Sequence, residues 1–225
     1  MTNYFYVSPE QLIKDRAEFA QKGIARGRSL VAAIYDKGVV MVAENPSASL
    51  NKISEVYDRI AFAGVGRYNE FDRLREAGIR WADSTGFTYS REDVDARALA
   101  NYYAQHLGDM FTEGQKPLEV EILVAQLGNA LRPTKLYRVA YEGTISDEQH
   151  FAVVGGDSET IRDRFALTEE SVKSLATTLQ NAAAALGGPD RVLPAEELEV
   201  CILEDRGNRR TFLRLTDDQV KEMLS

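Results

Sequence analysis

The chain has 225 residues, 44% apolar and 28% charged, which is enough to bury one sizeable core and indicates a single domain over residues 1–225. Its net charge of -8 argues against nucleic acid or an anionic membrane as a partner, and no stretch approaches the ~20 apolar residues of a membrane span. The single cysteine, Cys201, excludes an intramolecular disulfide and favours a reducing, cytoplasmic location. With only two histidines, the distant His106 and His150, no metal-ligand cluster can be assembled.

The first predicted element is a helix over residues 8–22. Ser8 has the side chain of an N-cap, Pro9 suits the first helical position, and Gln11 can reach back to complete a capping box. Gly23 then reads as a residue that ends the helix. Because this helix precedes the first strand, it lies outside the core layers, where it either contacts a partner or forms a plain surface helix.

Two strands are predicted next, at residues 28–35 and 39–43. Both runs are apolar on both pleat faces, which predicts a hairpin buried between two layers. The turn between them ends on Gly38, where a positive φ is expected. Lys52 opens the strand that follows.

The rest of the chain alternates blocks of strands with pairs of helices. The predicted elements are strands at 52–57 and 60–65, helices at 67–83 and 94–111, strands at 119–127, 136–141 and 151–154, a short helix after residue 157, a helix at 169–186, strands at 198–203 and 211–215 with a turn at 206–208, and a helix at 217–224. This order predicts two stacked antiparallel sheets covered by helices on each side. The fold class is therefore α+β, a four-layer αββα sandwich with an extra N-terminal helix.

One glycine motif stands before a predicted helix and could hold a phosphate, namely Gly155-Gly156-Asp157-Ser158. It lacks the spacing and the lysine of a Walker motif, and the dinucleotide-binding pattern is also missing. It is interpreted as a tight turn from strand to helix. No cofactor is expected.

Three segments carry a resemblance to a known family. They read YVSPEQLIKDRAEFAQKGIARGRS, VAENPSASLNKISEVYDRIAFAGVGRYNEFDRLREAGI, and KPLEVEILVAQLG with the later KLYRVAYEGTISDEQHFAVVGG, and they span residue 6 to about residue 156. The SPEQ and NEFDRLR helices are the specific signals. These segments resemble the α-type subunit of the 20S proteasome in its actinobacterial form, a family with the N-terminal-nucleophile hydrolase fold.

The start of the first strand separates the catalytic β type of that family from the α type. In the β type the mature chain begins with a threonine that is exposed by cleavage after a glycine. Alignment on the hairpin turn puts Arg28 at that position, directly after Gly27, with Glu44 near the β-type aspartate and Lys52 near the β-type lysine. Arginine has no hydroxyl or thiol and stays protonated, so it cannot act as the nucleophile.

Two alternatives remain beside the α-type interpretation. The first is a self-processing N-terminal-nucleophile peptidase that uses Ser29. This hydroxyl stands one residue too late, so its side chain points to the opposite pleat face, and the helix at residues 8–22 would have to be removed to free it. The second alternative is a stand-alone binding module on the same fold.

The resemblance implies a non-catalytic α subunit of a bacterial 20S core particle, which as a complex is a threonine-type endopeptidase. Seven copies would form each outer ring and would contact neighbouring α subunits and the catalytic β rings, whose assembly they support. The rings would gate substrate entry. They would also bind the C-terminal tail of an AAA ATPase ring or of an ATP-independent activator, for ATP-dependent protein degradation linked to the ubiquitin-like protein Pup.

The resemblance also implies two sites. Residues 1–7 would fill or line the axial pore as a gate, with Tyr4, Phe5 and Tyr6 packing against their copies and Pro9 at the turn into the helix.

The second implied site is an activator pocket between neighbouring α subunits. Lys52 would pair with the terminal carboxylate of the activator tail, since an ammonium and a carboxylate form a charge-assisted hydrogen bond. Glu18 and Gly66 match the same pocket motif.

One segment departs from the common family pattern. Residues 116–119 read Lys-Pro-Leu-Glu where many α subunits have Arg-Pro-aromatic-Gly, so the resemblance does not identify the residues that line the inner constriction.

Overall fold

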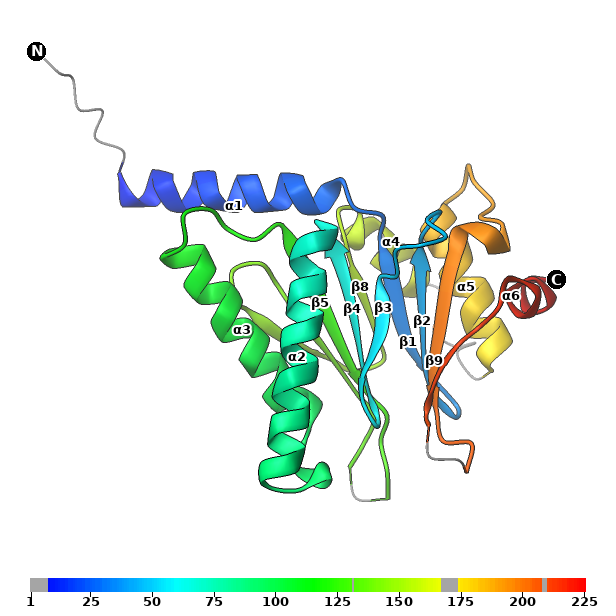
Figure 1. The fold of residues 1–225 in the computed structure, drawn as a ribbon. Coiled ribbons are helices and arrows are strands. Elements are labelled where there is room, and N and C mark those ends of the chain that lie inside the picture. Colours follow the sequence, from blue (N-terminus) through cyan, green and yellow to red (C-terminus); the bar gives the residue numbers. More distant parts are fainter. Residues whose placement is uncertain (1–7, 131, 167–173, 208–209) are drawn as a thin grey trace, which may run out of the picture.

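The computed structural model describes residues 8–130, 132–166, 174–207 and 210–225 (Figure 1). Its helices and strands are α1 (Pro9–Ala25), β1 (Leu30–Tyr35), β2 (Gly38–Glu44), β3 (Ile53–Tyr57), β4 (Ile60–Gly66), α2 (Tyr68–Thr88), η1 (Arg91–Asp93), α3 (Ala96–Thr112), β5 (Val120–Gln126), β6 (Lys135–Val139), β7 (Ile145–Glu148), β8 (Phe151–Val154), α4 (Ser158–Ala166), α5 (Leu175–Gly187), η3 (Ala195–Glu197), β9 (Leu198–Glu204), β10 (Phe212–Arg214) and α6 (Asp217–Leu224). None of these helices has the length and apolarity needed to cross a membrane.

The strands form two antiparallel sheets, ordered β10-β9-β2-β1-β8 and β3-β4-β5-β6-β7. One apolar cluster fills the space between the sheets and includes Met41 and Leu123. A second lies between the first sheet and α4, α5 and α6, and includes Leu179. A third lies between the second sheet and α2 and α3, and includes Phe62 and Tyr103. The predicted four-layer αββα sandwich is confirmed.

The first hairpin lies at the centre of its sheet, as its apolar faces predict. β1 pairs with β2 and β8, and β2 pairs with β9, so every residue of β2 is buried. The expectation of a positive φ at Gly38 was wrong, because Gly38 is not among the positive-φ residues. Glycine is needed there for clearance, since a Cβ would lie 3.0 Å from the carbonyl carbon of Leu203 on β9.

Helix α1 lies across one end of the sandwich, above the ends of α2 and α3 (Figure 1). Ser8 accepts a hydrogen bond from the Gln11 backbone N–H at 3.2 Å and is its N-cap. The second half of the predicted capping box is absent, because the Gln11 side chain donates to Asp15 at 2.6 Å instead.

The predicted end of α1 at Gly23 was also wrong. The helix continues to Ala25, and Gly23 is buried inside it. A Cβ on Gly23 would lie 2.6 Å from the Cβ of Glu119, at the start of β5. Glycine therefore occupies this helical position because α1 packs directly on the Glu119 side chain.

Other boundaries moved for local reasons. α3 begins at Ala96, two residues later than predicted, because the Asp95 side chain accepts from the Ala98 backbone N–H at 2.8 Å and caps the helix. α5 begins after its N-cap Ser174. Residues 169–173 of the helix predicted at 169–186 lie outside the described residues. Residue 208 of the turn predicted at 206–208 lies outside them as well. Strand β7 was not predicted.

The glycine motif before α4 forms a tight turn, as predicted. Gly155 has φ +123°, and its carbonyl accepts from the Ser158 backbone N–H at 3.3 Å.

Candidate functional site

Charged side chains meet at the open end of the β1–β2 hairpin, where the β type of the resembled family has its nucleophile. Glu44 ends β2 with 7% of its surface exposed, and its Oε1 accepts from Arg28 and from Arg191, each at 2.7 Å. Lys52 Nζ donates to the backbone carbonyls of Arg28 at 2.7 Å and Glu44 at 2.9 Å. We call Arg28, Glu44, Lys52 and Arg191 the hairpin-end cluster.

A buried carboxylate on β9 holds the backbone of Lys52. Glu199 accepts from the backbone N–H groups of Lys52 at 2.8 Å and Ile53 at 3.1 Å, and from the Asn45 side chain at 2.8 Å. The Arg214 guanidinium also donates to it. The entry to β3, and with it the root of the Lys52 side chain, is therefore fixed by the sheet that contains β9.

The ammonium of Lys52 lies in an unusual environment for a lysine. In the part of the chain that the structure describes, both of its hydrogen bonds go to backbone carbonyls and none goes to a carboxylate. Burial lowers the pKa of Lys52 to about 8, and this outweighs the opposing effects of Glu199 and Glu44, while Arg28 lowers it further. Lys52 is charged at neutral pH but loses its proton more readily than an exposed lysine.

The cluster offers cations but no nucleophile for acyl transfer. Arg28 occupies the nucleophile position of the hairpin. Ser29 is buried at 7% exposure and packs against Gly155, and its hydroxyl has no hydrogen-bonded base among the described residues. Burial between the sheets raises the pKa of the Cys201 thiol to about 12, which keeps it protonated. In the described residues no group of three or more His, Cys, Asp or Glu side chains is placed to hold a metal ion.

The predicted pocket residues fall into two places. Gly66 has φ +113°, and its backbone nitrogen lies 2.8 Å from where a Cβ on Gly27 would stand. Lys52 and Gly66 therefore both border residues 27–28. Glu18 lies on the exposed side of α1, where the ion pair described for it is with Lys22 at 3.7 Å. Within the described residues Lys52 and Gly66 border the same segment, and no contact described for Glu18 joins it to them.

The predicted gate falls mostly outside the described residues. Tyr4, Phe5 and Tyr6 are among residues 1–7, which the structure does not describe. Pro9 is the first residue of α1, directly after its N-cap Ser8.

A second charged cluster lies beneath α1, and we call it the α1-side cluster. Lys116 contacts Glu70 at 2.5 Å and Glu119 at 3.2 Å, and Arg67 contacts Glu119 at 3.0 Å. Burial lowers the pKa of Lys116, but its hydrogen bonds to Glu70 and Glu119 outweigh this effect, and the net shift is upward. Glu70 also accepts from the Glu119 backbone N–H at 2.7 Å, so the two carboxylates are fixed together.

One residue that the sequence did not single out anchors α1 to the helical layer. Arg16 donates from Nε to the Phe111 carbonyl at 2.7 Å, and from its terminal nitrogen to the carbonyls of Met110 at 3.2 Å and Gly114. The Met110 and Phe111 carbonyls belong to the last turn of α3, where no intrahelical donors remain, and Gly114 follows the helix. An arginine in the middle of an amphipathic helix carries no sequence signal for this contact.

The comparisons with known proteins agree on one family. The family model described as Proteasome subunit matches residues 24–184. A protein named "Proteasome subunit alpha" from Acidimicrobium ferrooxidans is 57% identical over 224 residues, which cover 100% of this chain and 97% of the relative. Proteins of the same name from Sanguibacter keddieii (49% identical) and a Nocardioides species (50% identical) each match 100% of this chain and 90% of their own length.

The chain belongs to the proteasome subunit family. The predicted recognition as a bacterial α-type member is confirmed, because these relatives carry the α name over the full chain. The hairpin-end cluster agrees with that type, since an arginine stands at the position of the β-type threonine. Within this family the chain is a non-catalytic component.

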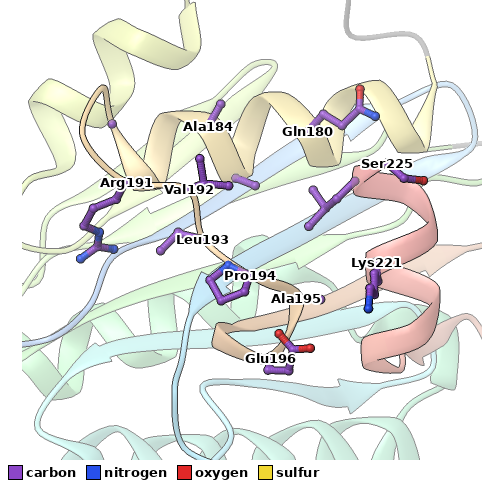
Figure 2. A pocket seen from close by; sticks show the side chains of 13 residues that line it. Gln180, Ala184, Arg191, Val192, Leu193, Pro194, Ala195, Glu196, Lys221 and Ser225 are labelled. Atoms are coloured by element: carbon purple, nitrogen blue, oxygen red, sulfur yellow. The ribbon is translucent and has the colours of Figure 1, made fainter.

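An apolar pocket lies on the other side of Arg191, between α5, α6 and residues 188–196 (Figure 2). Its volume is about 670 Å³, and Val192, Leu193 and Pro194 line its middle. The side chain of Gln180 on its rim donates to the Met223 carbonyl at 2.8 Å. Among its lining residues Ser225 carries a hydroxyl, which donates to the Glu222 carbonyl at 2.7 Å.

Proposed function

We propose that this chain builds the seven-membered outer rings of a bacterial 20S proteasome core particle in the cytoplasm, as one domain over residues 1–225. The observation that carries this proposal is Arg28 at the end of the hairpin, hydrogen-bonded to Glu44 at 2.7 Å. The β-type machinery is replaced there by a salt bridge. In the complex this chain would have a structural role, with contacts to neighbouring α subunits and to the catalytic β ring.

In this proposal Lys52 receives the terminal carboxylate of an activator's C-terminal tail, and Gly66 borders the same pocket. The support is geometric, since the Lys52 ammonium is held by two carbonyls and has no carboxylate among its described hydrogen-bond partners. An incoming carboxylate would supply the missing counter-charge in a partly desolvated place, where such a bond is strong. Glu18 would have to join the pocket from a neighbouring copy. The activator would be an AAA ATPase ring or an ATP-independent protein that delivers unfolded, Pup-linked substrates.

The assembly is tested by native mass spectrometry of tagged chain recovered from its own cells. We expect a 28-subunit particle with equal amounts of this full-length chain and of a second subunit that starts with threonine. Purified chain without the second subunit should hydrolyse no peptide. A lone monomer, or peptide hydrolysis that survives removal of the second subunit, would contradict the proposal.

The gate is tested by deleting residues 2–7. The deletion should speed hydrolysis of small peptides by the assembled particle, because the aromatic segment at Tyr4, Phe5 and Tyr6 would no longer cover the pore. An unchanged rate would remove the gate assignment without affecting the assembly.

The runner-up is the self-processing peptidase that uses Ser29. It requires a mature chain that begins at Ser29, and intact-mass measurement would detect the loss of residues 1–28 directly. The burial of Ser29 at 7% exposure argues against this function.

A further inference from the structure

We propose that Lys52 is an acylation site for acyl phosphates, with Arg28 and Arg191 receiving the phosphate of the donor. The chemistry of the site stands by itself, whereas its regulatory consequence rests on the proposed activator pocket. Acylation would remove the ammonium that the pocket uses and would thus switch off activator docking.

The geometry around Nζ suits a nucleophilic amine. A tetrahedral amine nitrogen has four positions, of which Cε takes one. The carbonyls of Arg28 and Glu44 take two more through hydrogen bonds of 2.7 and 2.9 Å. When Lys52 is neutral, its two hydrogens can satisfy both carbonyls, so the lone pair takes the remaining position and points away from them. The backbone thus orients the lone pair for attack.

The two arginines supply a docking place for an anionic donor. Arg28 and Arg191 both bind Glu44 Oε1, yet their side chains remain 53% and 45% exposed. One buried carboxylate cannot neutralise two guanidinium groups and the nearby ammonium. Guanidinium forks recognise phosphate oxygens well, so an acyl phosphate would place its anionic end here and its carbonyl carbon beside Nζ.

The transfer itself needs only these partners. The neutral amine attacks the carbonyl carbon of the acyl phosphate, and a C–N bond forms while the C–O bond to phosphate breaks. Phosphate leaves with the electron pair of that bond, and water takes the extra proton from nitrogen. The product is an uncharged amide on Lys52.

Burial of the side chain, against the net effect of the charges that face Nζ, keeps part of the amine neutral near pH 8. Burial lowers the pKa of Lys52 to about 8, opposed by Glu199 on β9 and Glu44 on β2 and assisted by Arg28. About half of Lys52 is therefore neutral at pH 8, against less than about 1% of an ordinary lysine with a pKa near 10.4. A less basic amine is also a weaker nucleophile, and a Brønsted slope of about 0.4–0.5, as found for thiolates, offsets about a factor of ten of this advantage. From the pKa alone, acylation is expected to be about tenfold faster than at an exposed lysine, and docking of the phosphate on the arginines adds to this.

The test treats the purified full-length chain with acetyl phosphate and measures site occupancy over time by peptide mass spectrometry. Lys37 and Lys221, both exposed in the same chain, are the internal references. We expect Lys52 to react at least about tenfold faster than either at pH 8, and its rate to level off above that pH while the references keep rising. A Lys52 rate no faster than that of Lys37 would overturn the proposal.

The arginines are tested with two donors. Arg191→Gln should slow acetylation by acetyl phosphate several-fold relative to acetylation by an uncharged N-hydroxysuccinimide ester. The matched control Arg80→Gln, which changes an exposed arginine on α2, should leave that ratio unchanged. An unchanged ratio in Arg191→Gln would show that the phosphate does not dock there. Because the ratio is taken within one variant, a general change at Lys52 cancels.

The consequence is measured on the assembled particle after acetylation. Activator-stimulated protein degradation should fall in proportion to Lys52 occupancy, while unstimulated peptide hydrolysis stays constant. If Lys52 is acetylated and stimulation persists, the activator pocket is wrong and the modification stands. If Lys52 resists acetylation while Lys52→Ala abolishes stimulation, the pocket stands and the modification is wrong.

Discussion

Two lysines in this chain lie among arginines and buried carboxylates, yet they differ in what they bind. Lys116 in the α1-side cluster contacts two carboxylates, Glu70 and Glu119, and its pKa is raised. The ammonium of Lys52 in the hairpin-end cluster hydrogen-bonds only to carbonyls among the described residues, and its pKa is lowered to about 8. The first cluster is closed on itself and holds α1 in place. In the second, no described carboxylate is hydrogen-bonded to the ammonium, and the proposed activator pocket rests on this.

The largest difference between the two clusters should appear in activator-stimulated protein degradation when each lysine is replaced. Lys52→Ala should abolish activator-stimulated protein degradation while sparing assembly, because a hydrogen bond to a charged group contributes about 1.5–3 kcal/mol at each tail. Lys116→Ala, in whatever fraction assembles, should keep normal stimulation. The measurement is degradation of an unfolded protein with and without activator. Normal stimulation of the Lys52→Ala particle would mean that the Lys52 ammonium does not bind the activator tail.

The next largest effect should lie in the packing of α1 on the closed cluster. Gly23→Ala should lower the free energy of unfolding by about 2–3 kcal/mol, because the added Cβ overlaps the fixed Glu119 side chain. Urea denaturation of the isolated chain measures this. Gly108→Ala on α3 is the matched control, since its Cβ would meet only the Glu142 carbonyl at 3.7 Å. That variant should be neutral or up to about 1 kcal/mol more stable, as alanine favours helix. Equal behaviour of both variants would mean that Glu119 moves aside easily.

The smallest effect should be electrostatic. At pH 7, Lys116→Met should lower the free energy of unfolding by about 1 kcal/mol, a value reduced by the exposure of the ammonium. Lys52→Met should change it little, because the cost of burying the ammonium offsets its two hydrogen bonds to carbonyls. Denaturant unfolding of both variants beside the wild type provides the comparison.

The free energies of unfolding of wild type and Lys52→Met should also differ in their pH dependence. The pKa of Lys52 is lower in the folded chain, about 8, than in the unfolded chain, about 10.4. Between these values the unfolded chain binds more protons, so wild-type stability should rise with pH relative to Lys52→Met. The raised pKa of Lys116 acts oppositely, since its contribution is complete at neutral pH and is lost only above about pH 10.4. A flat difference between wild type and Lys52→Met over pH 8–10 would contradict the lowered pKa.

Elements with local signals were predictable from the sequence. The helix predicted at residues 217–224 is α6, and Thr216 directly before it is its N-cap. The apolar faces of β1 and β2 placed the hairpin between two layers. The polar edge strand β7 was missed, because Ile145–Glu148 is only partly buried and shows no alternation.

Contacts between distant segments were not predictable. Gly23 has the local appearance of a helix end, and the reason it is not one is Glu119, which lies far along the chain on another element. Arg28, Glu44 and Lys52 were found through the hairpin alignment, but Arg191 lies in a loop without any signal, and only the fold brings it to Glu44. Sequence reasoning therefore found the part of the site carried by one hairpin and missed the part supplied by tertiary structure.

The contact of Arg16 with the end of α3 bears on the order in which the chain folds. Its guanidinium reaches the Phe111 carbonyl across 95 positions of sequence. Closing so long a loop is slow, and helix α3 with its neighbouring strands can form from much more local contacts. α1 is synthesised before α3 and β5 and has its docking surface only after they exist. The N-terminal helix is therefore expected to be among the last elements to settle, and a nascent chain would carry it undocked until more than half of its residues have been synthesised.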